Sequence, residues 1–122
     1  MSNYFIEEGS GRMDAGAVVE WKFPEFDQRF PVKVLDVKDN ERVSFEWEGA
    51  EGQHLTVQIV LEQRSGTATL VKITEGKMPN NEAGIKWLKG NTEGWANFLA
   101  CLKAYLEYGI NLRKGAFDFM KP

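Results

Sequence analysis

The chain has 122 residues and a formal net charge of −3, with 43% apolar and 27% charged residues. This length suits one domain, and the composition is that of a folded globular protein and not of a disordered one. Binding of nucleic acid needs a concentrated cationic surface. The longest basic run is Arg113-Lys114, which we interpret as a solvated helix end or tail, so we expect no nucleic-acid partner.

The sequence also bears on location. No apolar run approaches the ~20 residues that a membrane helix needs, so we expect no membrane insertion. The single cysteine excludes a disulfide within the chain, and the first eight residues lack the basic and apolar regions of a signal peptide. The simplest location is the cytoplasm.

The first part of the chain changes from an irregular segment to strands. Residues 1–16 are expected to be irregular, because Gly9, Gly11 and Gly16 interrupt any longer element. Alternation of apolar and polar residues then predicts an antiparallel meander over residues 17–75. Its five strands are expected at residues 17–23, 32–37, 43–47, 55–61 and 67–74.

Three details of this meander follow from the residue types. Pro24 and Pro31 are expected to bracket a loop, since proline cannot donate to a strand ladder. Residues 48–53 are expected to form a polar loop, and Asp39-Asn40 a tight turn. In the second strand the sequence does not decide which face is buried, because Val32 and Val34 have the opposite parity to Leu35 and Val37.

Residues 80–108 are predicted to be helical. Asn81 is a candidate cap for a short first helix, which Gly90-Asn91-Thr92 is expected to interrupt, with Asn91 or Thr92 capping the main helix. An apolar stripe at spacings of three and four follows, and Gly109 is expected to end the helix. The stripe consists of Trp95, Phe98, Leu99, Leu102, Tyr105 and Leu106. The tail, residues 109–122, is apolar enough that we expect it to pack against something.

Four local patterns resemble one known family. They are Val43-Ser44-Phe45-Glu46-Trp47, Ser65-Gly66-Thr67-Ala68-Thr69-Leu70, the helix that starts Glu93-Gly94-Trp95, and the ending from Glu107-Tyr108-Gly109 to Ala116-Phe117. In this order the chain resembles the activator of heat-shock protein 90 ATPase homologue-like family, within the START-like (polyketide cyclase, birch-pollen-allergen-like) superfamily.

The resemblance implies an α+β fold of the helix-grip (START-like) type, in which a curved antiparallel sheet packs on one long C-terminal helix. Members usually begin with a strand and a helix before the segment that Tyr4-Phe5 resembles, so the chain is expected to be an N-terminally truncated version of that fold. A missing first strand would leave sheet edges unpaired. We therefore expect a homodimer that covers the gap.

The sequence is poor in catalytic groups, so we expect no enzyme, no catalytic residue, no metal site and no cofactor. His54 is the only histidine, and we interpret it as a surface or structural residue; no metal-binding spacing of histidines and carboxylates occurs. Cys101 is interpreted as a small buried hydrophobic residue of the helix. Carboxylates such as Glu25 and Asp27 are interpreted as solvated charges of a loop.

The aromatic residues give the most informative hypothesis. A group of nine residues could converge between the sheet and the helix, either as a filled core or as the lining of an apolar ligand cavity. The group is Trp21, Phe23, Phe45, Trp47, Val57, Ile59, Trp95, Phe98 and Leu102. Trp87 and Tyr105 are candidates for the rim, and Thr69 and Gln58 for polar anchors.

The expected function is non-enzymatic binding of a small hydrophobic ligand in such a cavity. The alternatives are a protein-interaction module like the chaperone activators that give the family its name, and, with less support, an enzyme of the cyclase or hydrolase kind. A shared fold does not decide between these functions.

Overall fold

The structure is a computed structural model that describes residues 1–121. Within these residues the backbone forms six strands in the order β1-β2-β3-β4-β5-β6, so strands that follow each other in sequence are neighbours in the sheet. The strands are β1 (Glu8–Gly9), β2 (Val18–Lys22), β3 (Arg29–Lys38), β4 (Arg42–Ala50), β5 (Gln53–Gln63) and β6 (Thr69–Glu75). The long helix α1 (Glu82–Tyr108) and the short 3-10 helix η1 (Asp118–Met120) follow. The predicted antiparallel meander is confirmed, with one more strand than expected.

The chain divides into two compact units. The helix unit contains Met1–Ser10, Glu20–Phe30 and everything described from Pro79 onward. The sheet unit contains Gly11–Val19 and Pro31–Met78.

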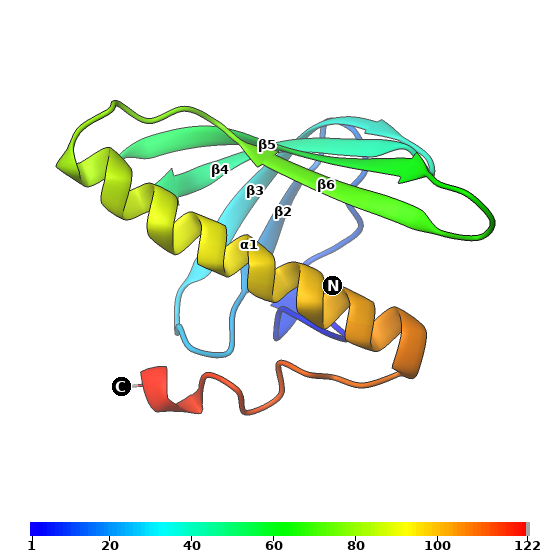
Figure 1. Ribbon diagram of the computed structural model, residues 1–122. Helices are drawn as coiled ribbons and strands as arrows, with labels where there is room; N and C mark the ends of the chain where they lie inside the picture. Colours follow the sequence, from blue (N-terminus) through cyan, green and yellow to red (C-terminus); the bar gives the residue numbers. More distant parts are fainter. Residues whose placement is uncertain (122) are drawn as a thin grey trace. The chain divides into compact units, whose positions relative to one another are not determined.

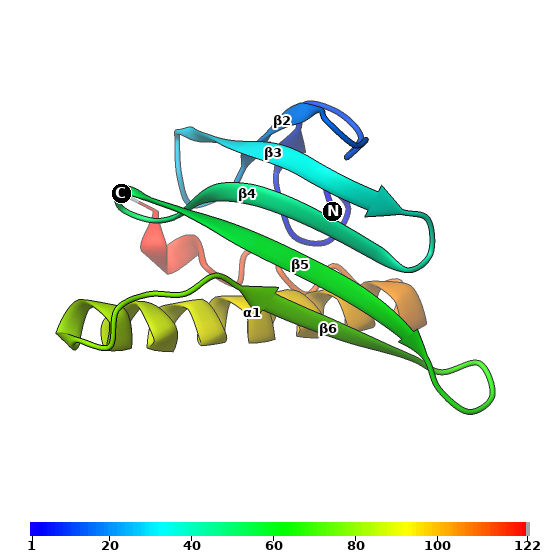
Figure 2. The same ribbon diagram turned by 90° about the horizontal axis from the view of Figure 1, so that it is seen from above.

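In the sheet unit, β3 to β6 lie side by side in sequence order (Figure 2). One face of these strands is buried: Phe45 on β4 lies opposite Val57 on β5, and both side chains are fully buried. The partner of Val57 on β6 is Glu75, which therefore lies on the same apolar face. The buried residues of this unit are Val19, Val32, Val34, Phe45, Leu55 and Val57.

An irregularity in β3 resolves the open question of its buried face. The register with β4 shifts between Val34 and Asp36, so that Val34 pairs with Phe45 and Val37 with Val43. An extra residue in one strand reverses the parity of the residues after it. Val34 and Val37 therefore lie on one face although they are three residues apart, and Leu35 is left exposed.

One loop prediction in this region is confirmed only in part, because the loop over residues 23–28 ends before Pro31, and a second one is wrong. Pro31 lies inside β3, but the pairing with β4 begins only at Lys33, and a proline near the start of a strand removes no bond from that ladder. The polar residues 48–53 do not form a loop, because β4 continues to Ala50 and β5 begins at Gln53. The two residues between them suffice for the turn, since Gly52 adopts a positive φ of 71°. The turn at Asp39-Asn40 is confirmed, with Asn40 at a φ of 62°.

In the helix unit, α1 is one continuous helix of 27 residues. The side chain of Asn81 accepts a hydrogen bond from the Gly84 N–H at 2.9 Å, as a cap does. The predicted interruption at Gly90-Asn91-Thr92 is wrong, because a single glycine lowers helix stability by only about 1 kcal/mol, less than renucleating a helix costs. Gly109 ends α1 with a φ of 67°, as predicted.

The N-terminal segment and the tail both contact α1 or each other within this unit. Tyr4 stacks on Tyr105 with ring centroids 5.5 Å apart, and Phe5 meets Phe98 edge to face at 5.0 Å. After α1 the tail reverses direction and runs back toward the other end of the helix (Figure 1). The segment 1–16 is not wholly irregular, because Glu8 and Gly9 form β1 and pair with Lys22 and Trp21 of β2.

Candidate functional site

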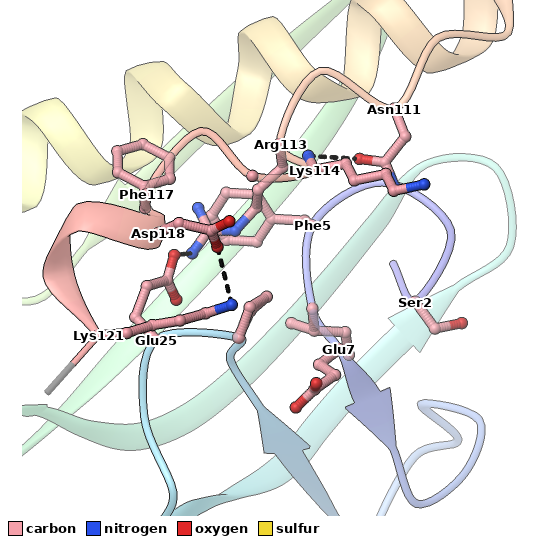
Figure 3. A pocket seen from close by; sticks show the side chains of 13 residues that line it. Ser2, Phe5, Glu7, Glu25, Asn111, Arg113, Lys114, Phe117, Asp118 and Lys121 are labelled. Carbon is pink, nitrogen blue, oxygen red and sulfur yellow. Dashed lines mark hydrogen bonds and ion pairs between the residues drawn. The ribbon is translucent and has the colours of Figure 1, made fainter.

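The helix unit contains a pocket of about 620 Å³ (Figure 3). Three segments that are distant in sequence line it: the N-terminal residues before β1, the loop after β2, and the tail after α1. The N-terminal segment supplies Phe5 and Ile6, the loop supplies Glu25, and the tail supplies Arg113 and Phe117. The pocket therefore exists because the tail turns back on α1, as Gly109 allows.

A buried ion pair joins two of these segments. Arg113 donates a hydrogen bond from its Nη2 atom to Oε1 of Glu25, across 88 positions in sequence. Only 10% of the arginine side chain and 4% of the glutamate side chain are exposed. A pair buried this deeply holds the tail against the loop after β2, because separating the two charges would leave each of them buried without a counter-charge.

Aromatic rings surround the guanidinium group. Its carbon lies 4.2 Å from the ring centroid of Phe5, 4.8 Å from that of Phe117 and 5.9 Å from that of Phe23. Such contacts are attractive, because the ring face carries partial negative charge. They also leave the edge of the guanidinium, where its N–H groups lie, for hydrogen bonding.

Two atoms of the ion pair lack a hydrogen-bond partner in the described structure. They are Oε2 of Glu25, an acceptor, and Nε of Arg113, a donor, and both are buried. A buried polar atom without a partner costs about 1–3 kcal/mol, so native proteins usually satisfy it. These two atoms are enclosed, so the described residues leave one acceptor and one donor of the ion pair unsatisfied within the fold.

The other charged groups of the pocket lie toward its rim. Lys121 donates to Asp118 at 2.8 Å, and this hydrogen bond raises the pKa of the lysine. The carboxylate of Glu7 is bonded to Lys22, and that bond lowers the pKa of Glu7. Three acidic residues (Glu7, Glu25 and Asp118) and three basic residues (Arg113, Lys114 and Lys121) line the pocket, so their formal charges sum to zero.

The sheet unit carries a second buried polar contact. Nε1 of Trp47 donates to Oε1 of Glu75 at 2.7 Å, and Oε2 of Glu75 is buried without a described partner. Gly49 permits this approach, because a Cβ at that position would lie 2.9 Å from the Glu75 oxygen. Glu75 is the one carboxylate that the register places on the apolar face of β4 to β6 beside Val57.

The nine residues predicted as cavity lining divide between the two units. Phe45, Trp47, Val57 and Ile59 belong to the sheet unit, where Phe45 meets Trp47 edge to face at 6.1 Å. Trp21, Phe23, Trp95, Phe98 and Leu102 belong to the helix unit, where Phe98 contacts Trp95 at 5.4 Å. None of the nine lines the pocket of Figure 3, so their role as a ligand cavity stays a prediction.

The predicted rim residues and polar anchors lie in different surroundings. Tyr105 accepts a hydrogen bond from Asn3, and Trp87 is half-buried with its Nε1 atom unpartnered in the described structure. Gln58 is exposed on the side of β5 opposite Val57, and Thr69 is exposed at the start of β6. Gln58 and Thr69 are therefore poor anchors for a buried ligand.

Sequence reasoning missed the two residues at the centre of the pocket. Glu25 and Arg113 were both expected to be solvated, and the structure shows both to be buried. Neither lies in an amphipathic pattern, because one is in a loop and the other in the tail. Apolar residues close to Glu25 and Arg113 in sequence, such as Phe23 and Phe117, were the signal that could have indicated burial of these segments.

The groups that could support catalysis or bind metal are sparse. The side chain of His54 is 67% exposed, and Cys101 is buried, which raises the pKa of its thiol. Among residues 1–121, no three histidine, cysteine or acidic side chains gather in a way that could hold a metal ion. None of the described helices is both long and apolar enough to cross a membrane.

Comparison with known families identifies the family to which this chain belongs. Residues 4–107 match the sequence model of the family described as activator of Hsp90 ATPase homolog 1-like protein. The chain belongs to this family. The fold is thus the α+β helix-grip fold of the START-like superfamily, as the motifs predicted.

Solved structures agree with this assignment. Protein SSP2350 from Staphylococcus saprophyticus is 28% identical, with a TM-score of 0.78 over 92% of this chain and 77% of its own. DynU16, from the dynemicin biosynthetic locus, is 25% identical with a TM-score of 0.74, over 90% of this chain but only 39% of its own. Protein BH1534 from Bacillus halodurans is 17% identical with a TM-score of 0.56, over 80% of this chain and 72% of its own, which shows the fold alone. None of the curated proteins compared with the chain matches it.

Proposed function

We propose that this protein binds a small hydrophobic molecule and does not catalyse its conversion. The observation that carries the proposal is the pocket of about 620 Å³, in which the Phe5 and Phe117 rings lie beside the buried Glu25–Arg113 pair. This volume lies within the range of about 300–1,000 Å³ that is typical of small-molecule sites, and the apolar part of the lining consists of Phe5, Ile6, Pro24 and Phe117. Membership of a superfamily whose fold includes ligand-binding proteins supports the same reading.

A ligand screen with a matched pair of variants tests this proposal. We expect some members of a panel of aromatic metabolites and lipids to raise the melting temperature of the full chain. Phe117→Ala should weaken their binding, because Phe117 lines the pocket, whereas Phe119→Ala should not, because Phe119 is 81% exposed outside it. A panel without any response, or equal effects of the two variants, would contradict the proposal.

Two observations favour other functions. The family description points to a protein-interaction module that activates a chaperone ATPase, and stimulation of Hsp90 ATPase turnover by the purified chain would support it. The superfamily also includes polyketide cyclases, and DynU16 is a putative protein of a biosynthetic locus, so an enzyme of the cyclase kind is another candidate. In that case a measured turnover should be lost in His54→Ala, the only histidine variant available.

A further inference from the structure

The ion pairs of the pocket leave one charge of its lining uncompensated, which specifies the ligand if the pocket binds a small molecule as proposed above. Every acidic residue of the lining has a basic partner: Glu25 pairs with Arg113, Asp118 with Lys121, and Glu7 with Lys22. Lys22 does not itself line the pocket. Within residues 1–121, Lys114 is therefore the one charged residue of the lining that forms no ion pair.

Lys121, the other exposed cation of the lining, already has acidic neighbours. Its ammonium group donates to Asp118 at 2.8 Å, and the negative charges of Glu7 and Glu25 act on it as well; together these raise the pKa of the lysine. The side chain of Lys114 instead extends away from Glu25, Asp118 and Lys121 (Figure 3). The uncompensated positive charge thus lies apart from the acidic groups of the pocket.

Two neutral donors share this side of the pocket with Lys114. Oδ1 of Asn111 accepts a hydrogen bond from the backbone N–H of Lys114 at 3.1 Å, which orients the amide and leaves its NH₂ group as a donor. The hydroxyl-bearing residue Ser2 also lines the pocket and lies on the same side in Figure 3. All three residues are exposed, so a ligand in the pocket can reach them. We call Ser2, Asn111 and Lys114 the donor side.

A donor side with one positive charge favours an anionic ligand group. A carboxylate has two oxygens that accept several hydrogen bonds, and hydrogen bonds to an ionised group are about twice as strong as those between neutral groups. An ammonium group would meet only the like charge of Lys114 at the donor side. The apolar part of the lining, which includes Phe5 and Phe117, suits an apolar or aromatic body.

We propose that the pocket binds a monocarboxylate with an apolar or aromatic body: the donor side binds the carboxylate, with Lys114 as its counter-charge, and the rings of Phe5 and Phe117 contact the body. One full negative charge on the ligand matches the one positive charge that the lining leaves uncompensated. The buried ion pair then has a positional role, because it holds the tail that carries Asn111 and Lys114.

Four probes that vary either the polar group or the apolar body test this class. Hydrocinnamate carries both parts, hydrocinnamamide is its neutral amide, phenethylammonium is cationic, and acetate has the carboxylate without the body. Each is titrated at millimolar concentration into the full chain, and the backbone amide signals of Lys114 and Gly115 are followed by NMR. We expect hydrocinnamate to shift these signals and to bind at least about tenfold more tightly than each of the other three.

Variants at exposed positions test the donor side without disturbing the core. Lys114→Gln removes the charge and keeps a side chain of similar length, so the preference for hydrocinnamate over hydrocinnamamide should disappear. Lys89→Gln is the matched control, since it removes the same charge from an exposed residue of α1 that does not line the pocket. Asn111→Asp keeps an oxygen for the Lys114 N–H but replaces the donor with a negative charge, and should weaken hydrocinnamate more than hydrocinnamamide.

The outcomes distinguish this inference from the function on which it rests. Equal binding of hydrocinnamate and hydrocinnamamide, with loss of both in Phe117→Ala, would overturn the carboxylate class and leave hydrophobic-ligand binding intact. Equal weakening in Lys114→Gln and Lys89→Gln would mean that the anion follows net charge and not this site, and would also overturn it. Because a peptide ends in the same group, N-acetylphenylalanine is included: tighter binding than hydrocinnamate supports a peptide C-terminus as the source, and weaker binding supports a free small acid.

Discussion

Removal of the Glu25–Arg113 ion pair should lower the free energy of unfolding strongly. Both side chains are nine-tenths buried or more, so removing one partner leaves the other charge uncompensated. Glu25→Gln or Arg113→Met should each lower the free energy of unfolding by about 3 kcal/mol, and the double variant by less than the sum. Urea unfolding followed by circular dichroism measures these differences.

An exposed ion pair of the same unit serves as the control for this measurement. Arg29 bonds to Glu8, and these side chains are 44% and 56% exposed. Glu8→Gln should lower stability by less than about 1 kcal/mol, because water screens and solvates the charges that remain. Equal losses in Glu8→Gln and Glu25→Gln would show that the Glu25–Arg113 pair is not buried in solution.

Cys101 should be an unreactive thiol in the folded chain. It is 4% exposed, and burial raises its pKa, although the charge of Arg113 acts in the opposite direction. The thiolate is the reactive form, so a raised pKa leaves less thiolate at neutral pH. The rate at which Cys101 reacts with a thiol reagent should therefore increase only as the pH rises above the ordinary thiol pKa. Ellman's reagent should therefore label the folded protein far more slowly than the urea-unfolded protein; similar rates would contradict this.

At the level of single residues, the sequence predicts burial where a periodic pattern exists. The burial of Val19, Trp21, Phe45 and Val57 follows from alternation along strands, and that of Phe98 and Cys101 from the helix. The burial of Glu25 depends instead on a tail that lies 88 positions later, which no local pattern reports. The candidate site was therefore missed although most of the core was predicted.

At the level of elements, the errors have two physical causes. In β3 a bulge changes which residues face the core, and a tight turn after β4 lets that strand extend further than predicted. The bulge and the turn both depend on pairing with a neighbouring strand. In α1 the glycine at position 90 lowers helix propensity, but the helix continues because breaking it would need a second cap. Element type was thus predictable, whereas boundaries depended on interactions outside each segment.

The first turn of α1 gives a sharp test of one glycine. A Cβ at Gly84 would lie 1.9 Å from the carbonyl oxygen of Pro79, which is part of the backbone and cannot rotate away. Gly84→Ala should therefore lower stability by more than about 2 kcal/mol and disturb the Asn81 cap. Thermal unfolding and the helical signal in circular dichroism report both effects.

A second glycine of the same helix makes the control. Nothing lies within 4 Å of a Cβ placed at Gly94. Gly94→Ala should raise stability by about 0.5–1 kcal/mol, because alanine loses less conformational freedom in a helix than glycine does. If both substitutions had the same sign, the close approach at Pro79 would not exist in solution.

For the whole molecule, the homodimer stays a prediction, and two features of the described residues support it. β6 is at one end of the strand order, so one side of this seven-residue strand has no neighbouring strand within residues 1–121. Part of the tail, which was expected to pack, is exposed instead. Its exposed apolar residues are Ile110, Leu112, Phe119 and Met120. Open strand edges and exposed apolar side chains both favour association.

Sedimentation velocity at micromolar concentration should therefore show a dimer. Phe119→Ser should shift the equilibrium toward monomer, because it replaces the most exposed aromatic ring of the tail, at 81%, with a small polar group. Val18→Ser is the control: Val18 is 64% exposed but belongs to the sheet unit and not to the tail. A dimer that dissociates equally in both variants would place the interface elsewhere than the tail, and a monomer throughout the concentration range would overturn the homodimer.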